Sequence, residues 1–338
     1  MKTENSKKIT AIVPNFNHGH CIGRAVECLN GQSRKPDEIV IVDDGSSDNS
    51  VEIINALSKA FNNIRVIKNS KNLGVVRSLN LGLQIATGDL IYCGAADDYV
   101  GANLFCELEH ATKLSEMFGF VTAEAQVVDP NGEKQAVRPS VRMCNQSRYL
   151  SPNAIKRTLE QSDNLFLSVA TLYDKESLLS VGGFDERLGP FCDSFALRQI
   201  ALRYGCIFVP KILGVWVRDP QSYSQSLVYD SVVQEKFIES VYRKAKTDEF
   251  MNDEYACLLR KRLYFFSNRL RLKSGTMDFT DILAKNQSLF GNKIFTKIST
   301  WLPKSILRRV IFLFLIAFDC PVAFWPILRT KIMRCMPF

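Results

Sequence analysis

Hydrophobic positions follow two alternating spacings over the first hundred residues. Short β-branched runs occupy residues 9–14, 38–43, 64–68 and 89–93, as expected for buried parallel strands. The intervening segments carry apolar residues at helical spacing, at residues 21–30, 50–61 and 78–88. This order predicts βαβ units, that is, an α/β fold with a mainly parallel sheet flanked by helices. Gly88 is suited to cap the third helix.

The pattern becomes mixed between residues 100 and 225. Runs typical of strands lie at residues 119–123, 164–174, 206–210 and 213–218. Residues 151–161 are expected to form a helix with Ser151 as its N-cap and Pro152 in the first turn. Residues 226–290 show a helical pattern without a motif. We therefore predict a mixed α/β domain at residues 1–225 and a helical C-terminal region at 226–338.

The C-terminal region holds the basic excess of the chain. Residues 1–225 carry 24 Lys and Arg against 25 Asp and Glu, whereas residues 226–338 carry 19 against 10. Residues 310–328 form an apolar run with Asp319 as its one charge, and basic residues flank it. This pattern favours a segment, residues 306–334, that lies on an anionic membrane surface, over nucleic acid as the partner. A buried helix pair is the alternative.

The ends of the chain and its cysteines bear on the compartment. The N-terminal sequence "MKTENSKKIT" has no apolar stretch, so no secretory signal is expected. Ten cysteines are scattered without a CxxC pair, which favours reduced, mostly buried thiols. We expect a cytoplasmic protein that is peripheral on the inner face of the cell membrane. His18 and His20 alone provide too few ligands for a structural zinc site.

Polar residues follow each of the first four predicted strands. They occupy residues 14–17, 43–48, 69–74 and 94–98, and two of these segments contain paired aspartates. Because ligands bind beyond the carboxyl ends of parallel strands, these segments define the candidate site. Adjacent carboxylates repel each other unless a cation or a ligand lies between them. Asp97 and Asp98 are therefore predicted to bind Mg²⁺ or Mn²⁺, which prefer oxygen ligands and substrate phosphates.

Several motifs, taken in order, resemble a known family. "VDDGSSD", "NLG", "ATGD", "CGAADDYV" and "VGGFDERLGPFCDSF" are similar to motifs of the family 2 glycosyltransferases, and the similarity covers about residues 8–220. The resemblance implies the GT-A fold, which has a Rossmann-like sheet. In this chain we expect a helical C-terminal extension after it. It also implies an inverting enzyme that uses a nucleotide-sugar donor, with a UDP-sugar expected. The acceptor would be a glycan or a lipid-linked saccharide.

The resemblance assigns roles to individual residues. Pro14 and Phe16 match the border of the nucleotide base, and Asp44 matches the carboxylate that bonds the base. Asp97 matches the last acid of the DxD motif, a metal and donor ligand, with Asp98 beside it. Asp193 matches the general base. The remaining expected donor-binding residues are Asn17, Gly74 and Arg218, the last near the diphosphate.

The chain departs from the family pattern at two positions. Ala95 replaces the first acid of DxD, and Cys192 stands where a Glu often precedes the base. These changes leave open a non-catalytic protein that binds nucleotide sugars or scaffolds a glycan-assembly complex. Asp193 could also be an N-cap of the following helix. A nucleotidyltransferase is less favoured, because "PNFNHGH" is not a Gly-rich basic loop.

Overall fold

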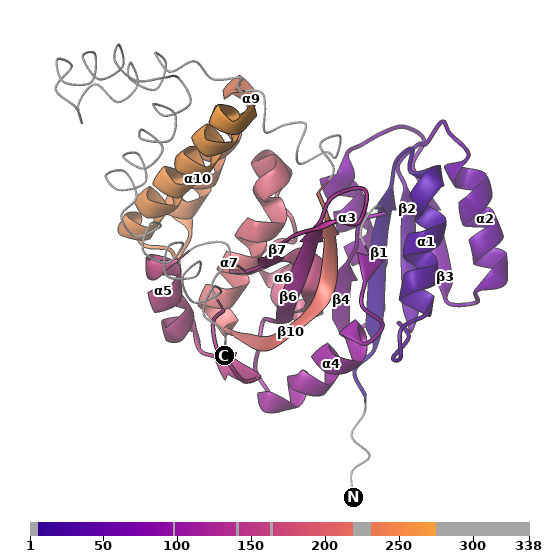
Figure 1. The fold of residues 1–338 in the computed structure, drawn as a ribbon, viewed down its shortest axis with the longest axis horizontal. Helices are drawn as coiled ribbons and strands as arrows, with labels where there is room; N and C mark the ends of the chain where they lie inside the picture. Colours follow the sequence, from indigo (N-terminus) through magenta and orange to yellow (C-terminus); the bar gives the residue numbers. More distant parts are fainter. Residues whose placement is uncertain (1–5, 97–98, 140–141, 163–164, 219–230, 275–338) are drawn as a thin grey trace, which may run out of the picture. The chain divides into compact units, whose positions relative to one another are not determined.

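The computed structural model describes residues 6–96, 99–139, 142–162, 165–218 and 231–274 (Figure 1). The chain divides into two compact units. The first comprises Met1–Leu159 and Asn164–Asp219, and the second comprises Glu160–Asp163 and Pro220–Phe338. Each unit is described by itself. Asp97, Asp98 and the predicted membrane segment 306–334 lie outside the described residues.

The first unit is built from alternating strands and helices. Its strands are β1 (Ile9–Asn15), β2 (Glu38–Asp43), β3 (Ile64–Lys68), β4 (Leu90–Cys93), β5 (Tyr99–Val100), β6 (Phe120–Val128), β7 (Lys134–Arg138), β8 (Arg148–Leu150), β9 (Thr171–Asp174) and β10 (Cys206–Val217). Its helices are α1 (Gly19–Asn30), α2 (Ser50–Ala60), α3 (Val75–Ile85), α4 (Leu104–Ala111), α6 (Lys175–Ser180) and α7 (Cys192–Tyr204). Helix α5 (Pro152–Gln161) begins here, and short 3₁₀ segments are η1 (Thr112–Leu114), η2 (Ser168–Ala170) and η3 (Glu186–Phe191).

The strands form a single mixed sheet in the order β3-β2-β1-β4-β9-β6-β10-β5, with β7 beside β6 and β8 beside β10. The pairs β1–β2, β2–β3, β1–β4 and β6–β10 are parallel. Strand β9 runs antiparallel to β4 and to β6. Because of this direction, β9 begins at the edge where β4 ends. The mainly parallel sheet flanked by helices is confirmed.

The core forms on both faces of the sheet because side chains alternate along each strand. Ile9, Ala11 and Val13 of β1 belong to a buried cluster with apolar residues of α1, α2 and α4. Ile12 points the other way, toward α3. A Cβ atom on Gly82 of α3 would lie 2.4 Å from Ile12 Cγ2, so a glycine is needed for this close approach.

Three local predictions differ from the structure. The two strands expected at 206–210 and 213–218 are one strand, β10, with register shifts between Val209 and Gly214 that allow it to bend. The strand expected from residue 164 begins only at Thr171, after η2. Gly88 does not cap α3, which ends at Ile85. A Cβ at Gly88 would lie 2.6 Å from the backbone nitrogen of Thr10. This glycine therefore permits the segment before β4 to approach the β1 backbone closely.

The second unit contains two packed helices, α9 (Ser231–Thr247) and α10 (Asp253–Ser274). Glu239 of α9 accepts hydrogen bonds from Arg260 Nε at 2.7 Å and from the Tyr264 hydroxyl at 2.9 Å. The helical character expected for this region is therefore seen where the chain is described. Among the described helices, none combines the length and the apolar character that crossing a membrane requires.

Candidate active site

The first four strands end side by side at one edge of the sheet. In the parallel register, Asn15 of β1 pairs with Asp43 of β2, and Asp43 pairs with Lys68 of β3. Cys93 ends β4 on the other side of β1. Strand β10 also ends at this edge, because it runs parallel to β6 and antiparallel strand β9 separates β6 from β4. The sheet thus brings together the strand-end segments singled out in the sequence.

The loop after β1 is fastened to the loop after β2. Asn15 Nδ2 donates to Asp43 Oδ1 at 3.0 Å, and both side chains are buried. Asn17 has φ of 56°, and its Oδ1 accepts a hydrogen bond from the Ser47 backbone N–H at 2.8 Å. Asn17, predicted as a donor-binding residue, therefore also anchors these loops. The Asp48 carboxylate joins both following helices, since it accepts from Gly19 N–H at 2.9 Å and from Ser50 N–H at 3.0 Å.

The predicted base-binding residues differ in exposure. Pro14 is buried in β1, whereas the Phe16 side chain is 39% exposed. An exposed aromatic ring directly after a strand offers a face on which a nucleobase can stack. The geometry therefore suits Phe16 for contact with a ligand and Pro14 for support of the strand end.

Asp44 is buried and bonded on both carboxylate oxygens. Its Oδ1 accepts from Asn69 Nδ2 at 2.7 Å and from Leu73 N–H at 2.9 Å, while Oδ2 accepts from Gly74 N–H at 2.8 Å. Gly74 has φ of 98° and precedes the first residue of α3. Asp44 therefore holds the β3–α3 loop against β2. Its predicted bond to a nucleotide base stays a prediction, and the backbone-fixing role was missed in the sequence.

The segment that follows β4 runs from this edge of the sheet to β10. Cys93 is its last residue, and Ala96 is buried three residues later. After Asp97 and Asp98, Tyr99 pairs with Val215 of β10. The Arg24 guanidinium of α1 lies 4.9 Å from the centroid of the Tyr99 ring. The described residues on both sides of the two aspartates are therefore fixed to the sheet and to α1.

Asp193 lies in the first turn of α7, at the edge where β4 ends and β9 begins. Ser168 Oγ, from η2 just before β9, donates a hydrogen bond to Asp193 Oδ2 at 2.8 Å. The Ser194 N–H donates to Asp193 Oδ1 at 2.5 Å. Helix α7 begins at Cys192 with Phe191 as its cap residue, so Asp193 is not the N-cap of this helix. Its carboxylate instead reaches the sheet.

Burial and neighbouring groups shift the pKa of Asp193 in opposite directions. Burial raises the pKa of the Asp193 carboxyl above its ordinary value, while the hydrogen bonds from Ser168 and Ser194 and the charge of Arg198 act in the opposite direction. Burial, and then the neighbouring Asp193 carboxylate, raise the pKa of the Cys93 thiol. The same two causes, in that order, raise the pKa of the Cys192 thiol. Both cysteines therefore stay neutral, and Asp193 is close enough to the end of β4 to affect Cys93.

A hydrogen-bonded chain extends from Asp193 into the core. Ser168 Oγ lies 3.0 Å from the hydroxyl of Tyr173, whose side chain is fully buried. A serine hydroxyl has one hydrogen, and here it is donated to Asp193. The Tyr173 hydroxyl must therefore donate to Ser168. Sequence reasoning missed Ser168 and Tyr173, because no motif marks a serine before an antiparallel strand.

Arg218 follows the last residue of β10. Its backbone N–H donates to the Val128 carbonyl at 2.8 Å, which fixes the strand end, and its guanidinium lies 5.8 Å from the centroid of the Trp216 ring. Arg218 is thus at the carboxyl edge of the sheet, where the resemblance expects a basic residue. Its contact with a diphosphate stays a prediction.

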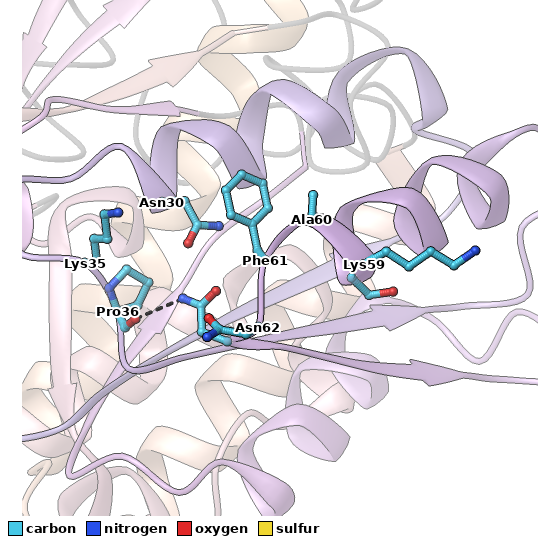
Figure 2. Close-up of a pocket in the computed structure, with 9 residues that line it drawn as sticks. Asn30, Lys35, Pro36, Lys59, Ala60, Phe61 and Asn62 are labelled. Carbon is cyan, nitrogen blue, oxygen red and sulfur yellow. Dashed lines mark hydrogen bonds between the residues drawn. The ribbon is translucent and has the colours of Figure 1, made fainter.

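A hollow of about 640 Å³ lies at the opposite edge of the sheet (Figure 2). Lys35, Pro36, Lys59 and Phe61 contribute to its lining, and Asn63 Nδ2 donates to the Pro36 carbonyl at 3.1 Å. Its lining residues include no carboxylate, histidine or cysteine, so it lacks the acidic base that the resemblance implies. Catalytic groups are therefore expected at the carboxyl edge.

The chain is similar to known proteins in sequence and in fold. The family model for Glycosyl transferase family 2 matches residues 10–165. Over residues 10–165 the chain matches the family 2 glycosyltransferases. The matched segment includes all four strand-end loops but stops before Asp193 and Arg218. The roles of those two residues therefore depend on position in the fold.

A curated relative and two solved structures show the extent of the similarity. The glycosyltransferase GlyG of Streptococcus pneumoniae serotype 4 is 35% identical over 99 residues, which cover 29% of this chain and 33% of the relative. The chain thus spans about a third of the length of this relative. TarS of S. aureus in complex with UDP-GlcNAc has a TM-score of 0.60 at 18% identity, covering 76% of this chain and 71% of that one.

The mannosyltransferase PcManGT from Pyrobaculum calidifontis, in complex with GDP-Man and Mn²⁺, has a TM-score of 0.55 at 18% identity. The match covers 96% of this chain and 88% of that chain. At such identities the two structures establish the fold, and the GT-A fold predicted from the sequence is confirmed.

Proposed function

We propose that the chain is an inverting glycosyltransferase that moves a sugar from a nucleotide diphosphate sugar to a hydroxyl of a glycan or lipid-linked acceptor. The family 2 domain supports the reaction class. Similarity to proteins solved with UDP-GlcNAc and with GDP-Man supports a nucleotide-sugar donor, and a UDP-sugar is the donor expected from the resemblance of the sequence. In this proposal Phe16, Asn17 and Asp44 border the nucleotide.

The position of Asp193 is the observation that carries the proposal. Its carboxylate bonds to Ser168 at the start of β9, and β9 begins beside the end of β4. Four residues beyond Cys93, the chain reaches Asp97. The candidate base therefore lies at the sheet edge where β4 ends, and the described chain leads from β4 to the candidate metal ligands.

The donor set fits a divalent metal ion by its chemistry. Asp97 and Asp98 would supply carboxylate oxygens, the ligands that Mg²⁺ and Mn²⁺ prefer. Asp44 instead keeps its proposed contact with the base, since its carboxylate has acceptor capacity beyond the three bonds to the β3–α3 loop. The metal would neutralise charge on the leaving diphosphate. Arg218 would add a fixed positive charge at the same edge.

Asp193 would act as the general base. A sugar hydroxyl is a poor nucleophile at neutral pH, so a carboxylate within hydrogen-bond reach takes its proton as it attacks the anomeric carbon. Ser168 and Ser194 hold the carboxylate in place and favour its charged form. Attack opposite to the departing diphosphate inverts the anomeric carbon in one displacement, and no enzyme nucleophile is required.

The experiment compares the native chain with two aspartate variants. Purified protein is incubated with Mn²⁺ and each of a panel of UDP- and GDP-sugars, with a membrane fraction as the source of acceptor, and released nucleoside diphosphate is measured. Asp193→Asn should abolish release but keep the thermal stabilisation by the same nucleotide. Asp174→Asn is the matched control, because Asp174 ends β9 at the opposite edge and caps α6. It should retain full activity.

The outcomes separate the parts of the proposal. Full activity of Asp193→Asn would exclude Asp193 as the base. Nucleotide binding without transfer from any donor would favour the non-catalytic alternative, which Ala95 motivates. Absence of any nucleotide effect would contradict the function itself. Contact of residues 306–334 with the cytoplasmic membrane surface belongs to the same proposal and is tested by cosedimentation with anionic vesicles.

A further inference from the structure

A second cluster of ligating side chains lies at the start of α1. One nitrogen of His18, one nitrogen of His20 and the sulfur of Cys21 all lie within 4.8 Å of one another. The two imidazole ring centroids are 5.8 Å apart, with an angle of 51° between the ring planes. The sequence analysis considered the two histidines alone and found too few ligands. The first helical turn adds the Cys21 sulfur as the third.

The His18 ring carries a polar atom that lacks a partner. Its Nδ1 is buried from solvent and makes no hydrogen bond to any described residue. A buried polar atom without a partner costs about 1–3 kcal/mol, so such atoms are rare unless a ligand or an ion satisfies them. Cys21 is buried and its Sγ lies 3.6 Å from the His18 carbonyl, so its side chain folds back toward His18.

We propose that His18, His20 and Cys21 form a three-ligand site for a borderline-soft divalent metal ion such as Zn²⁺. Imidazole nitrogen and thiolate sulfur are the ligands that this class of ion prefers, and water completes the tetrahedron. The Cys21 thiol releases its proton to solvent on binding. This site differs from the Asp97–Asp98 pair, whose oxygen donors favour Mg²⁺ or Mn²⁺.

The geometry requires a small adjustment. In a tetrahedral zinc site, neighbouring ligand atoms are about 3.3–3.6 Å apart, given metal–nitrogen bonds near 2.0 Å and metal–sulfur bonds near 2.3 Å. The ligand atoms, which now lie within 4.8 Å of one another, must therefore move closer by about 1 Å. His20 is exposed and can turn about its side-chain torsions without disturbing the core, whereas His18 is partly buried and Cys21 is buried. A bound ion would restrain the loop that carries Asn17.

Cobalt provides a direct test, because a Co²⁺–thiolate bond gives a charge-transfer absorption band. Untagged full-length protein, fully reduced, is titrated with Co²⁺ in excess Mg²⁺, which occupies oxygen-ligand sites. One equivalent should bind with a thiolate band, and Zn²⁺ should displace it. Cys21→Ser should abolish the band, and His20→Asn should weaken binding by roughly tenfold or more, because even outer-shell changes cost about 10–100-fold.

The chain offers matched controls. His110 is the third of its three histidines, and Cys106 is an exposed cysteine on the same helix, α4. His110→Asn and Cys106→Ser should leave Co²⁺ binding unchanged. His20→Asn replaces an exposed side chain, so the thermal unfolding of the metal-free variant should match that of the native chain. A thiolate band that persists in Cys21→Ser, equal affinity in His20→Asn, or no binding at one equivalent would overturn the proposal.

Discussion

Ser168 Oγ donates a hydrogen bond to Asp193 Oδ2 at 2.8 Å and lies 3.0 Å from the hydroxyl of the buried Tyr173. The three side chains come from a 3₁₀ segment, a helix and a strand that converge at the carboxyl edge of the sheet. The resulting chain of donors ends on the carboxylate proposed as the general base. Ser168 is therefore a positioning residue that also stabilises the charged form of Asp193.

Removing the Ser168 hydroxyl should change the pH dependence of transfer. Burial raises the pKa of Asp193, and the bond from Ser168 opposes that shift. Ser168→Ala therefore raises the pKa further. Because the base acts in its ionised form, the acidic limb of the kcat/KM profile should move to higher pH.

Tyr173→Phe provides a graded comparison, because it leaves Ser168 in contact with Asp193 and removes only the second donor. Its shift should have the same direction and be smaller. Ser58→Ala is the control, because Ser58 lies on α2, away from Asp193, and its hydroxyl bonds locally to the Asn55 carbonyl. An acidic limb that is unchanged in Ser168→Ala would show that Asp193 does not control the profile.

Gly45 should be far less tolerant of substitution than Gly132. Both have positive φ, 75° and 83°, so alanine is strained at either position. A Cβ on Gly45 would lie 2.8 Å from the Lys71 carbonyl carbon, whereas nothing lies within 4 Å at Gly132. Gly45→Ala should lower the free energy of unfolding by about 2–4 kcal/mol and Gly132→Ala by about 1 kcal/mol. Equal losses in urea unfolding would contradict the close packing of the two loops.

The periodic part of the sequence predicted the parallel sheet because β1 and β2 are buried on both faces and contain few polar residues. Ser151 was also identified correctly as the N-cap of α5, since its Oγ accepts from Ala154 N–H at 3.4 Å. Such features depend on neighbours within a few residues. Local chemistry was therefore sufficient to place them.

Contacts between distant segments could not be predicted in this way. The bond between Ser168 and Asp193 depends on the antiparallel insertion of β9 between β4 and β6. The bulged course of β10 is equally non-local, because it requires β6 as a partner. The second role of Asp44, fixing the β3–α3 loop, depends on the geometry of a loop about 30 residues away. The spacing of hydrophobic residues and the sequence motifs do not show which distant segments come into contact.

Asp44→Asn should weaken the attachment of the β3–α3 loop and lower the stability of the fold. An amide has one acceptor oxygen, so its NH₂ group would face the Gly74 N–H that now bonds Oδ2. The buried mismatch should cost about 1–3 kcal/mol of the free energy of unfolding, measured in urea. Asp129→Asn is the control, because Oδ1 accepts from the backbone N–H groups of Asn131 and Glu133, while Oδ2 accepts only a long 3.5 Å bond from the exposed Gln135 side chain. It should change stability by less than about 0.5 kcal/mol.

Arg142→Met should lower the free energy of unfolding, because it leaves a buried carboxylate without its partner. Arg142 Nε and Nη2 donate to the two oxygens of Glu124 at 2.8 and 2.7 Å, and the Glu124 side chain is only 2% exposed. Loss of the guanidinium leaves this carboxylate unpaired, at a cost of about 3 kcal/mol in urea unfolding.

The exposed pair Lys211–Glu107 is the comparison for that variant, with side chains 54% and 33% exposed. Lys211→Met should cost at most about 1 kcal/mol, because water screens exposed ion pairs. Adding Glu124→Gln to Arg142→Met should recover part of the lost stability, since a neutral amide is cheaper to bury than a carboxylate. If the double variant is less stable than Arg142→Met alone, the unpaired charge is not the cause of the loss.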